Sequence, residues 1–197
     1  MAKSPEKVQD FLEKLLSKAK SAAKKEFDEL AEFAKTNDDI DKLQKWDLAF
    51  YAEKLKQQKF DLDDNLLKPY FPLNQVIDGV FSVAQKLYGL SFKEVDGIET
   101  YHEDVKTYKI YDNNKNFKAI FYADFHPRKG KRDGAWMTLY KNQFKTDKQN
   151  ERPQVSVVCN FSKPTKNQPS LLTFNEVTTL FHEFGHALHG MLADTQY

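Results

Sequence analysis

Two hydrophobic periods divide the chain near residue 90. Before that point apolar residues recur every three or four positions, which places them on one side of α-helices. After it they alternate with polar residues, as in half-buried strands, until a final apolar run extends from Phe174 to Leu192. We therefore expect an α+β fold that is mostly helical. Residues 1–89 are expected to be a helical segment, and residues 90–197 a small antiparallel or mixed sheet followed by one helix.

Capping signals mark the first helices. Ser4 offers an N-cap hydroxyl and Pro5 a proline at the first helical position, so a helix is expected to run from here to Thr36–Asn37. The Asp38–Asp39 pair then predicts the start of a second helix. Its apolar residues lie on one side: Leu43, Trp46, Phe50, Tyr51 and Leu55.

A third helix is expected between Pro72 and Gly89. Glycine adopts the left-handed conformation of a helix C-terminus without strain, so Gly89 predicts the end of this helix. Gly79, inside it, indicates close packing. Residues 60–71 are interrupted by acidic residues and Pro69, and they indicate a short helix and a turn.

Five runs in the second half are expected to be strands. The second and third flank the turn-rich segment Asp112–Asn116 and predict a hairpin. A basic loop, His126–Gly134, precedes the fourth run, and a polar loop, Lys141–Pro153, precedes the fifth. The runs are Ser91–Val95, Val105–Tyr111, Phe117–Phe125, Ala135–Leu139 and Val155–Phe161.

Composition excludes several classes of partner. Lys and Arg number 30 and Asp and Glu 29, interspersed along the chain, so no net field attracts nucleic acid or an anionic membrane. One cysteine, Cys159, allows no intrachain disulfide and favours a reducing compartment. No apolar run is long enough to span a membrane, and no signal-peptide pattern opens the chain. We expect a cytoplasmic protein without nucleic-acid or membrane partners.

The final apolar run carries the pattern His182-Glu183-x-x-His186. Histidines four positions apart lie one above the other on a helix face, where two neutral imidazoles can ligate one zinc ion. Glu183 can reach a water on that metal and act as general base. The uncharged neighbours indicate a buried helix, because a charge there would be desolvated. Gly185 indicates either close approach of another backbone or a tolerated packing glycine.

A catalytic zinc site has three protein ligands and one open position. His189 lies on the same face, but about 10 Å along the axis from His182, so we expect a structural or supporting role for it. Glu176 is expected to be a first-turn acid. The third ligand is therefore expected to lie outside this chain. The basic loop, with Arg128 and Arg132, lacks the order of a phosphate-binding loop. Two further histidines are expected to bind no metal: His102 and His126.

The order of a helical part, a small sheet and a motif helix is that of zincins, in which a strand beside the metal helix can pair with an extended peptide. Several blocks in this order resemble the thimet oligopeptidase family of zinc metallopeptidases, and within it the bacterial peptidyl-dipeptidases. The resemblance covers essentially the whole chain. Its blocks are Trp46–Lys54, Lys68–Phe71, Tyr122–Met137, Val155–Phe161 and Leu171–Gly190.

The resemblance implies hydrolysis of short peptides in a deep channel between two mostly helical halves. Dipeptides leave from the C-terminus in the peptidyl-dipeptidase branch, and relatives cut internally. His182 and His186 are implied as zinc ligands and Glu183 as the catalytic carboxylate. The backbone partner of the substrate is implied to be either Gly134 and Ala135 or the strand Val155–Phe161.

Members of the family are several times longer than this chain. They carry a helical domain before the position of Met1 and, beyond the motif helix, a glutamate that is the third zinc ligand. The resemblance thus implies one truncated catalytic domain, rather than two independent domains, lacking N- and C-terminal parts. We expect such a chain to hold zinc weakly, to be inactive alone and to self-associate through exposed apolar surface.

Two other hypotheses stay open. The chain could be a non-catalytic helical scaffold or a degenerate binding paralogue, in which the H-E-x-x-H pattern is incidental. Alternatively, His182, His186 and His189 could hold a metal ion between two chains.

Overall fold

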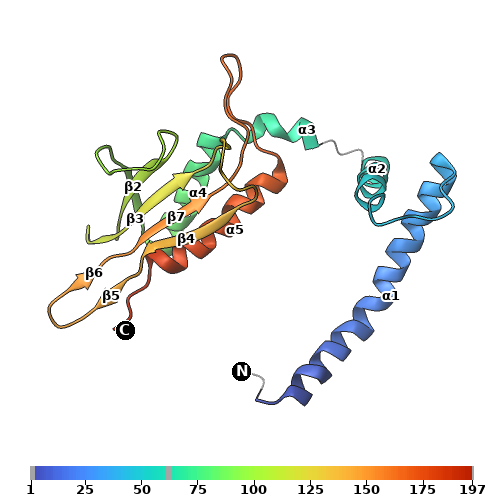
Figure 1. Ribbon diagram of the computed structural model, residues 1–197, viewed down its shortest axis with the longest axis horizontal. Coiled ribbons are helices and arrows are strands. Elements are labelled where there is room, and N and C mark those ends of the chain that lie inside the picture. Colours follow the sequence, from blue (N-terminus) through green and yellow to red (C-terminus); the bar gives the residue numbers. More distant parts are fainter. Residues whose placement is uncertain (1–2, 61–63, 197) are drawn as a thin grey trace. The chain divides into compact units, whose positions relative to one another are not determined.

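The computed structural model of the chain describes residues 3–60 and 64–196, and it is α+β with a mixed sheet, as the sequence predicts. The chain divides into two compact units, residues 1–63 and residues 64–197 (Figure 1). The first unit is helical, and the second contains the sheet. The division lies before the change of hydrophobic period at residue 90, because the third predicted helix packs on the sheet.

The first unit consists of α1 (Pro5–Asp38) and α2 (Leu48–Phe60). Ser4 caps α1 as predicted, since its side chain accepts a hydrogen bond from the Lys7 backbone N–H. Asp39 adopts the left-handed conformation, with φ of 56°, and its N–H donates to carbonyl groups one turn back. This geometry ends α1 close to the predicted position.

The predicted start of the second helix at Asp38–Asp39 is wrong. These residues end α1, because the left-handed Asp39 cannot also begin a right-handed helix. The Asp47 side chain instead accepts a hydrogen bond from the Gln44 backbone N–H at 2.9 Å and forms the turn that leads into α2. A small core joins the two helices of this unit, formed by Ala34, Leu43 and Tyr51.

The first half of α1 exposes its apolar stripe. Phe11 and Leu16 are 60% and 62% exposed within the described chain. The same side of the helix also carries Val8, Leu12 and Leu15, all exposed. The helix is therefore amphipathic over its whole length but buries its apolar side only near its end.

The second unit contains a five-stranded sheet in the order β1-β2-β3-β7-β4. Strands β3 and β7 are parallel, and the other neighbours are antiparallel. The five predicted strands are all present. The predicted polar loop Lys141–Pro153 is wrong in part, because β5 (Phe144–Lys145) and β6 (Asn150–Glu151) pair there as a short ribbon. The strands of the sheet are β1 (Ser91–Glu94), β2 (Lys106–Tyr111), β3 (Phe117–Asp124), β4 (Trp136–Lys141) and β7 (Gln154–Val158).

Two helices, α4 (Leu73–Tyr88) and α5 (Phe174–Met191), cover one face of this sheet (Figure 1). Gly89 ends α4 with φ of 66°, as predicted. The close packing predicted at Gly79 is wrong, because a Cβ atom there would meet no atom within 4 Å.

A short segment leads into α4. It comprises α3 (Asp64–Leu67) and a 3-10 turn over Lys68–Tyr70. They correspond to the short helix and turn predicted over residues 60–71, of which residues 61–63 lie outside the described part of the chain.

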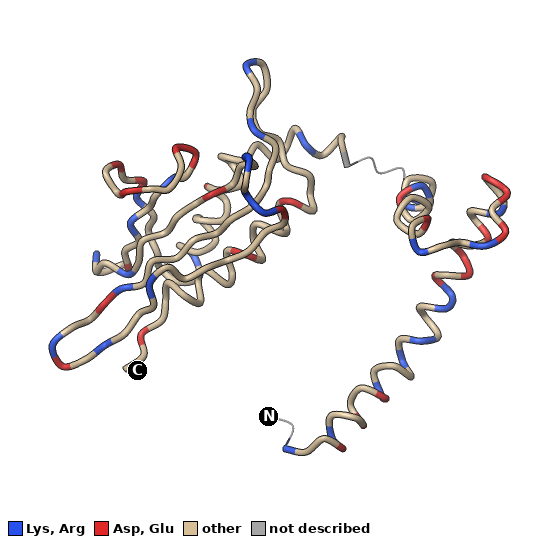
Figure 2. Tube along the Cα trace, in the orientation of Figure 1, with Lys and Arg blue, Asp and Glu red and all other residues tan. Residues whose placement is uncertain are grey.

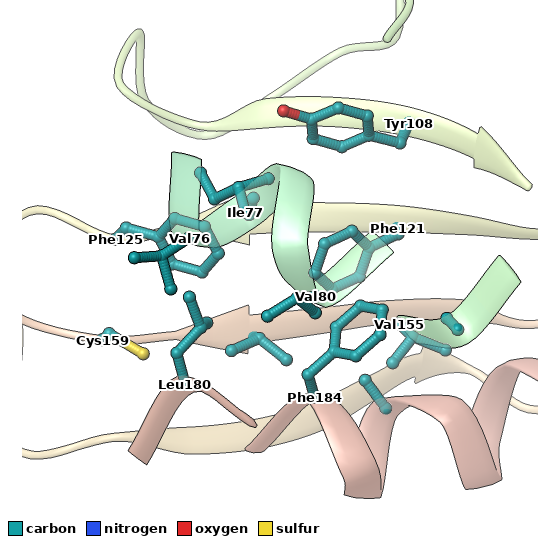
Figure 3. Packing of buried hydrophobic residues seen from close by; sticks show 14 of the residues in the cluster. Val76, Ile77, Val80, Tyr108, Phe121, Phe125, Val155, Cys159, Leu180 and Phe184 are labelled. Atoms are coloured by element: carbon teal, nitrogen blue, oxygen red, sulfur yellow. The ribbon is translucent and has the colours of Figure 1, made fainter. Parts of the chain in front are cut away.

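The main core lies between the two helices and the sheet. The Phe184 ring of α5 meets Phe81 of α4 at 5.9 Å between ring centroids, and Phe121 of β3 at 5.6 Å. Figure 3 shows Leu180 and Phe184 pointing from α5 toward the strands. Each such side chain contributes about 1.5–3 kcal/mol by leaving water. This packing determines which face of α5 turns inward and which faces outward.

Candidate active site

The N-terminus of α5 is fixed by a capping box. The Thr173 hydroxyl accepts a hydrogen bond from the Glu176 backbone N–H at 3.1 Å, and the Glu176 carboxylate accepts from the Thr173 N–H at 2.7 Å. Glu176 is thus the first-turn acid that the sequence predicts. The residues just before this cap pair with the start of α4, since the Leu172 N–H donates to the Phe71 carbonyl at 2.9 Å.

The C-terminus of α5 is held by Arg152, which lies just before β7. Its side chain is 9% exposed and donates to the backbone carbonyls of Met191 at 3.2 Å and Ala193 at 3.0 Å. A further hydrogen bond to the Lys118 carbonyl, at 2.8 Å, ties the same guanidinium to β3. A cation near the last carbonyls is favourable to a helix dipole. Both ends of α5 are therefore anchored to the rest of the second unit.

His182 and His186 lie together on the outward side of α5. Their Nε2 atoms are 3.2 Å apart, and their ring centroids are 4.8 Å apart. Both side chains are exposed, whereas Leu180, Phe184 and Ala187 of the same helix are buried. The predicted buried helix is therefore wrong for this face, because the helix buries one apolar side and carries the motif on the other.

The donor atoms of this pair suit zinc. Two nitrogens bound to one tetrahedral zinc ion at about 2.0–2.1 Å lie about 3.3 Å from each other. The observed separation of the His182 and His186 Nε2 atoms, 3.2 Å, is close to this value. Over residues 3–60 and 64–196, no three His, Cys, Asp or Glu side chains are grouped so that they could hold a metal ion. The described chain thus brings the side chains of the two predicted zinc ligands together.

Glu183 is half-buried on α5, one position after His182. The Cys159 thiol, just beyond β7, is fully buried, and burial first and the nearby Glu183 carboxylate second raise its pKa to about 12. The thiol is therefore neutral at physiological pH and inert as a nucleophile. Figure 3 shows Cys159 next to Leu180 of α5.

The structure distinguishes between the two segments that were predicted to pair with the substrate backbone. Strand β7 has β3 on one side and β4 on the other, so the alternative Val155–Phe161 is wrong for residues 154–158, whose ladder positions are filled. Strand β4 is the last strand of the sheet, with a neighbour on one side in the described chain. Gly134 and Ala135 lead directly into β4, next to the end of β7, since Trp136 is opposite Val158.

A buried ionic network lies at the end of β3, around Asp124. The Asp124 side chain is 2% exposed and accepts hydrogen bonds from Arg128 at 2.7 and 2.9 Å, from Lys131 at 2.8 Å and from the Tyr101 hydroxyl at 2.9 Å. Burial alone would raise the pKa of this carboxyl, but the three donors outweigh burial and lower it. Arg128 and Lys131 therefore serve a structural carboxylate, which agrees with the absence of a phosphate-binding order in the loop.

Sequence reasoning missed Asp124 and Tyr101. The pattern Asp-x-x-x-Arg-x-x-Lys over residues 124–131 was visible, but nothing in it showed that the basic residues fold back onto the acid. Tyr101 lies 23 positions earlier and carries no signal of its own. The available hint is that Asp124 stands between apolar residues at the end of a predicted strand. An acid in such a position is expected to be buried, and a buried carboxylate requires cationic partners.

The remaining histidines and Gly185 have surroundings of their own. The His126 Nδ1 atom is 3.2 Å from the Phe161 carbonyl oxygen, and the His102 Nδ1 atom is 3.6 Å from the Asp104 carboxylate. His189 is exposed near the end of α5. A Cβ atom at Gly185 would meet no atom within 4 Å, so no other described backbone approaches the helix there.

Figure 2 shows acidic and basic residues interspersed along both units. In the described ranges, none of the helices combines the length and the apolar character needed to cross a lipid bilayer.

Comparison with known proteins gives a consistent result. The sequence model of Peptidase family M3 matches residues 1–197. Oligopeptidase A of Escherichia coli (strain K12) is 42% identical over 193 residues, which cover 98% of this chain and 28% of the relative. Dipeptidyl carboxypeptidase of the same organism is 43% identical over 204 residues, covering 100% and 29%. A probable cytosolic oligopeptidase A of Arabidopsis thaliana is 38% identical over 195 residues, covering 95% and 28%. The chain thus spans a little more than a quarter of the length of these curated relatives.

Proposed function

Because the chain belongs to peptidase family M3, we propose that it forms part of the catalytic domain of a zinc-dependent peptidase that hydrolyses short peptides. One observation carries the proposal: the Nε2 atoms of His182 and His186 are 3.2 Å apart on the outward face of α5, with Glu183 between them in sequence. This is the donor set of an H-E-x-x-H zinc site, displayed on a helix whose two ends are anchored.

Each residue of the motif has a separate role. His182 and His186 would hold zinc through Nε2, and an acidic third ligand would come from the remainder of the longer enzyme. When bound, zinc supplies Lewis acidity and lowers the pKa of the attacking water. The Glu183 carboxylate takes the proton of that water and returns it to the leaving amine. Half-burial beside the apolar end of the sheet limits the hydration of this carboxylate.

The substrate is proposed to be an extended peptide that pairs with the edge of the sheet. Strand β4 and the preceding Gly134 and Ala135 lie next to the end of β7, and the Glu183 carboxylate helps to raise the pKa of Cys159, which follows β7. Backbone hydrogen bonds to an edge strand bind peptides with little dependence on sequence. We propose release of C-terminal dipeptides, as the name of the dipeptidyl carboxypeptidase relative states for that protein, with internal cleavage of oligopeptides as the second candidate.

The chain alone is proposed to bind zinc weakly and to be inactive, since two imidazoles are fewer than the three ligands of a catalytic site. The lone Cys159 and the probable cytosolic relative support a cytoplasmic enzyme.

The test uses an enzyme of full family length that contains this sequence. Glu183→Gln is expected to lower kcat on a fluorogenic oligopeptide by at least a hundredfold while zinc content stays at the wild-type level, because the amide cannot accept the proton. His189→Gln, on the same helix face, is the matched control and is expected to keep wild-type turnover. Equal turnover by the Glu183→Gln and wild-type enzymes would instead favour a non-catalytic scaffold with an incidental motif.

A further inference from the structure

The loop from His126 to Gly134 is held in place by hydrogen bonds from a buried lysine side chain. Lys131 projects inward from it, and its side chain is 3% exposed. The ammonium group donates to four oxygen acceptors: the Asp124 carboxylate at 2.8 Å and the backbone carbonyls of Asp124 at 3.0 Å, His126 at 2.8 Å and Cys159 at 2.6 Å. A buried ammonium without such partners would cost several kcal/mol, so this geometry is strongly specified.

The acceptors of Lys131 come from different parts of the sheet. Asp124 ends β3, Cys159 follows β7, and His126 belongs to the loop itself. The ammonium therefore joins the ends of two parallel strands to the loop that connects β3 with β4. Arg128 also contacts this carboxylate, through two parallel hydrogen bonds from its guanidinium group. Paired hydrogen bonds of this kind fix the relative orientation of the two side chains.

A second contact holds the far end of the loop. The Asn160 side-chain amide donates to the carbonyl of Arg132 at 3.0 Å and to the carbonyl of Gly134 at 2.7 Å. Asn160 follows Cys159, whose carbonyl accepts from Lys131. Consecutive residues after β7 thus hold the second half of the loop, and Gly134 is the last residue before Ala135 and β4.

We propose that Lys131, Asp124 and Asn160 are positioning residues that hold Gly134, whose φ is 94°, and Ala135 in the bend that leads into β4, and that they thereby fix where the edge strand begins to receive the peptide backbone. The inference rests on the proposed function, because it assigns these residues to the peptide edge of that site. None of the three touches the substrate. They act by holding the loop in place, and the loop determines where the edge strand β4 begins relative to α5.

The same loop offers a matched control. Lys129 is a lysine two positions from Lys131, but it is exposed and forms no hydrogen bond or ion pair with the described part of the chain. Lys131→Met keeps the length and apolar stem of the side chain and removes the ammonium. Lys129→Met makes the same chemical change where no buried network exists.

Hydrogen–deuterium exchange on the present chain measures the positioning directly. Lys131→Met is expected to speed amide exchange over residues 133–136 at least tenfold, with exchange in α5 and in the β2–β3 hairpin unchanged. Lys129→Met is expected to match the wild type. Unchanged exchange over residues 133–136, or equal acceleration throughout the second unit, would overturn the inference, since the second result describes a merely structural role.

Kinetics in the full-length enzyme provide the second readout. Lys131→Met is expected to raise KM for a fluorogenic oligopeptide about tenfold and to leave kcat within about twofold, because the loop binds the peptide but takes no part in proton transfer. An unchanged KM would overturn the inference even if exchange increases. The proposed function is tested separately, by the kcat of the Glu183→Gln enzyme. A failure of the proposed function therefore appears in kcat of that variant, and a failure of the present inference appears in KM of Lys131→Met.

Asn160→Ala keeps the inference testable if Lys131→Met does not fold. Asn160 lies near the surface, so the two carbonyl groups that it leaves can be hydrated. The same local acceleration of exchange and the same rise in KM are expected, each smaller than for Lys131→Met. Wild-type exchange and KM in Asn160→Ala would overturn the inference.

Discussion

At the scale of single residues, Asp124 is an acid that folding removes almost completely from water. Its carboxylate is almost fully buried and is surrounded by Arg128, Lys131 and the Tyr101 hydroxyl. The burial of Tyr101, together with its hydrogen bonds to Tyr140 and Asp124, raises the pKa of the Tyr101 phenol, so this hydroxyl stays a donor at physiological pH. One acid is thus satisfied by three separate donors, and removal of its charge should affect all of them.

Asp124→Asn is expected to lower the free energy of unfolding by about 3 kcal/mol at pH 7, because two cations lose their buried counter-ion. The pKa of Asp124 is lowered on folding, so its stabilisation is present above the unfolded value of about 3.9 and is lost as pH falls through the folded value. Urea unfolding should therefore show the difference between wild type and variant shrinking below about pH 4. Asp133→Asn, in the same loop but exposed, is the control. A constant difference from pH 7 to pH 2 would contradict the account.

Sequence spacing could predict the histidine pair but not the Asp124 network, for a physical reason. The relative positions of His182 and His186 are set by the helix itself, because residues four apart share a face. The positions of Tyr101 and Lys131 around Asp124 depend on how two loops fold over the ends of β3 and β7. Such contacts have no period, so hydrophobic pattern carries no information about them.

At the scale of elements, periodicity predicted most helices and strands, and local chemistry decided the exceptions. The left-handed Asp39 stopped α1 where an acidic pair suggested a new helix. The sequence did not reveal that α5 is buried on one side only. Phe181, Gly185 and the two histidines carry no charge, yet they lie on the exposed side of the helix. The predicted hairpin between β2 and β3 formed in the expected place, since turn residues and alternation agree there.

Two glycines of α5 provide an element-scale prediction. A Cβ atom at Gly190 would lie 2.8 Å from Leu139 Cδ2 and 3.4 Å from Val155 Cγ2, whereas at Gly185 it would meet nothing within 4 Å. Gly185→Ala is expected to raise the free energy of unfolding by up to about 1 kcal/mol through helix propensity. Gly190→Ala is expected to gain less than this, because the flexible, exposed end of Leu139 must shift to make room for the new methyl group. Urea unfolding measures both. Equal stabilisation by the two changes would show that α5 does not pack against β4 as described.

At the scale of the whole molecule, the chain has two separate cores. One joins α1 and α2 within residues 1–63, and the other, far larger, lies between α4, α5 and the sheet within residues 64–197. The residues proposed for zinc, catalysis and peptide binding all belong to the second unit. The exposed apolar stripe of α1 belongs to the first, and it is the surface through which we expect copies of the chain to associate.

A chain of residues 64–197 is therefore expected to fold without the first unit. It should keep a cooperative thermal transition within a few degrees of that of the main transition in the whole chain, because its core is complete. Calorimetry measures the transition. Sedimentation should show a monomer, whereas the whole chain is expected to associate as its concentration rises. Loss of the cooperative transition would show that the second core depends on residues 1–63.

Zinc titration of the present chain, followed by the ¹⁵N shifts of the histidine side chains, tests the central claim most directly. The account predicts that the Nε2 resonances of His182 and His186 shift together with one zinc ion per chain, while those of His102 and His126 stay unchanged. His182→Ala and His186→Ala should each weaken binding at least tenfold. Zinc that shifts neither Nε2 resonance, or that binds equally well after both substitutions, would contradict it.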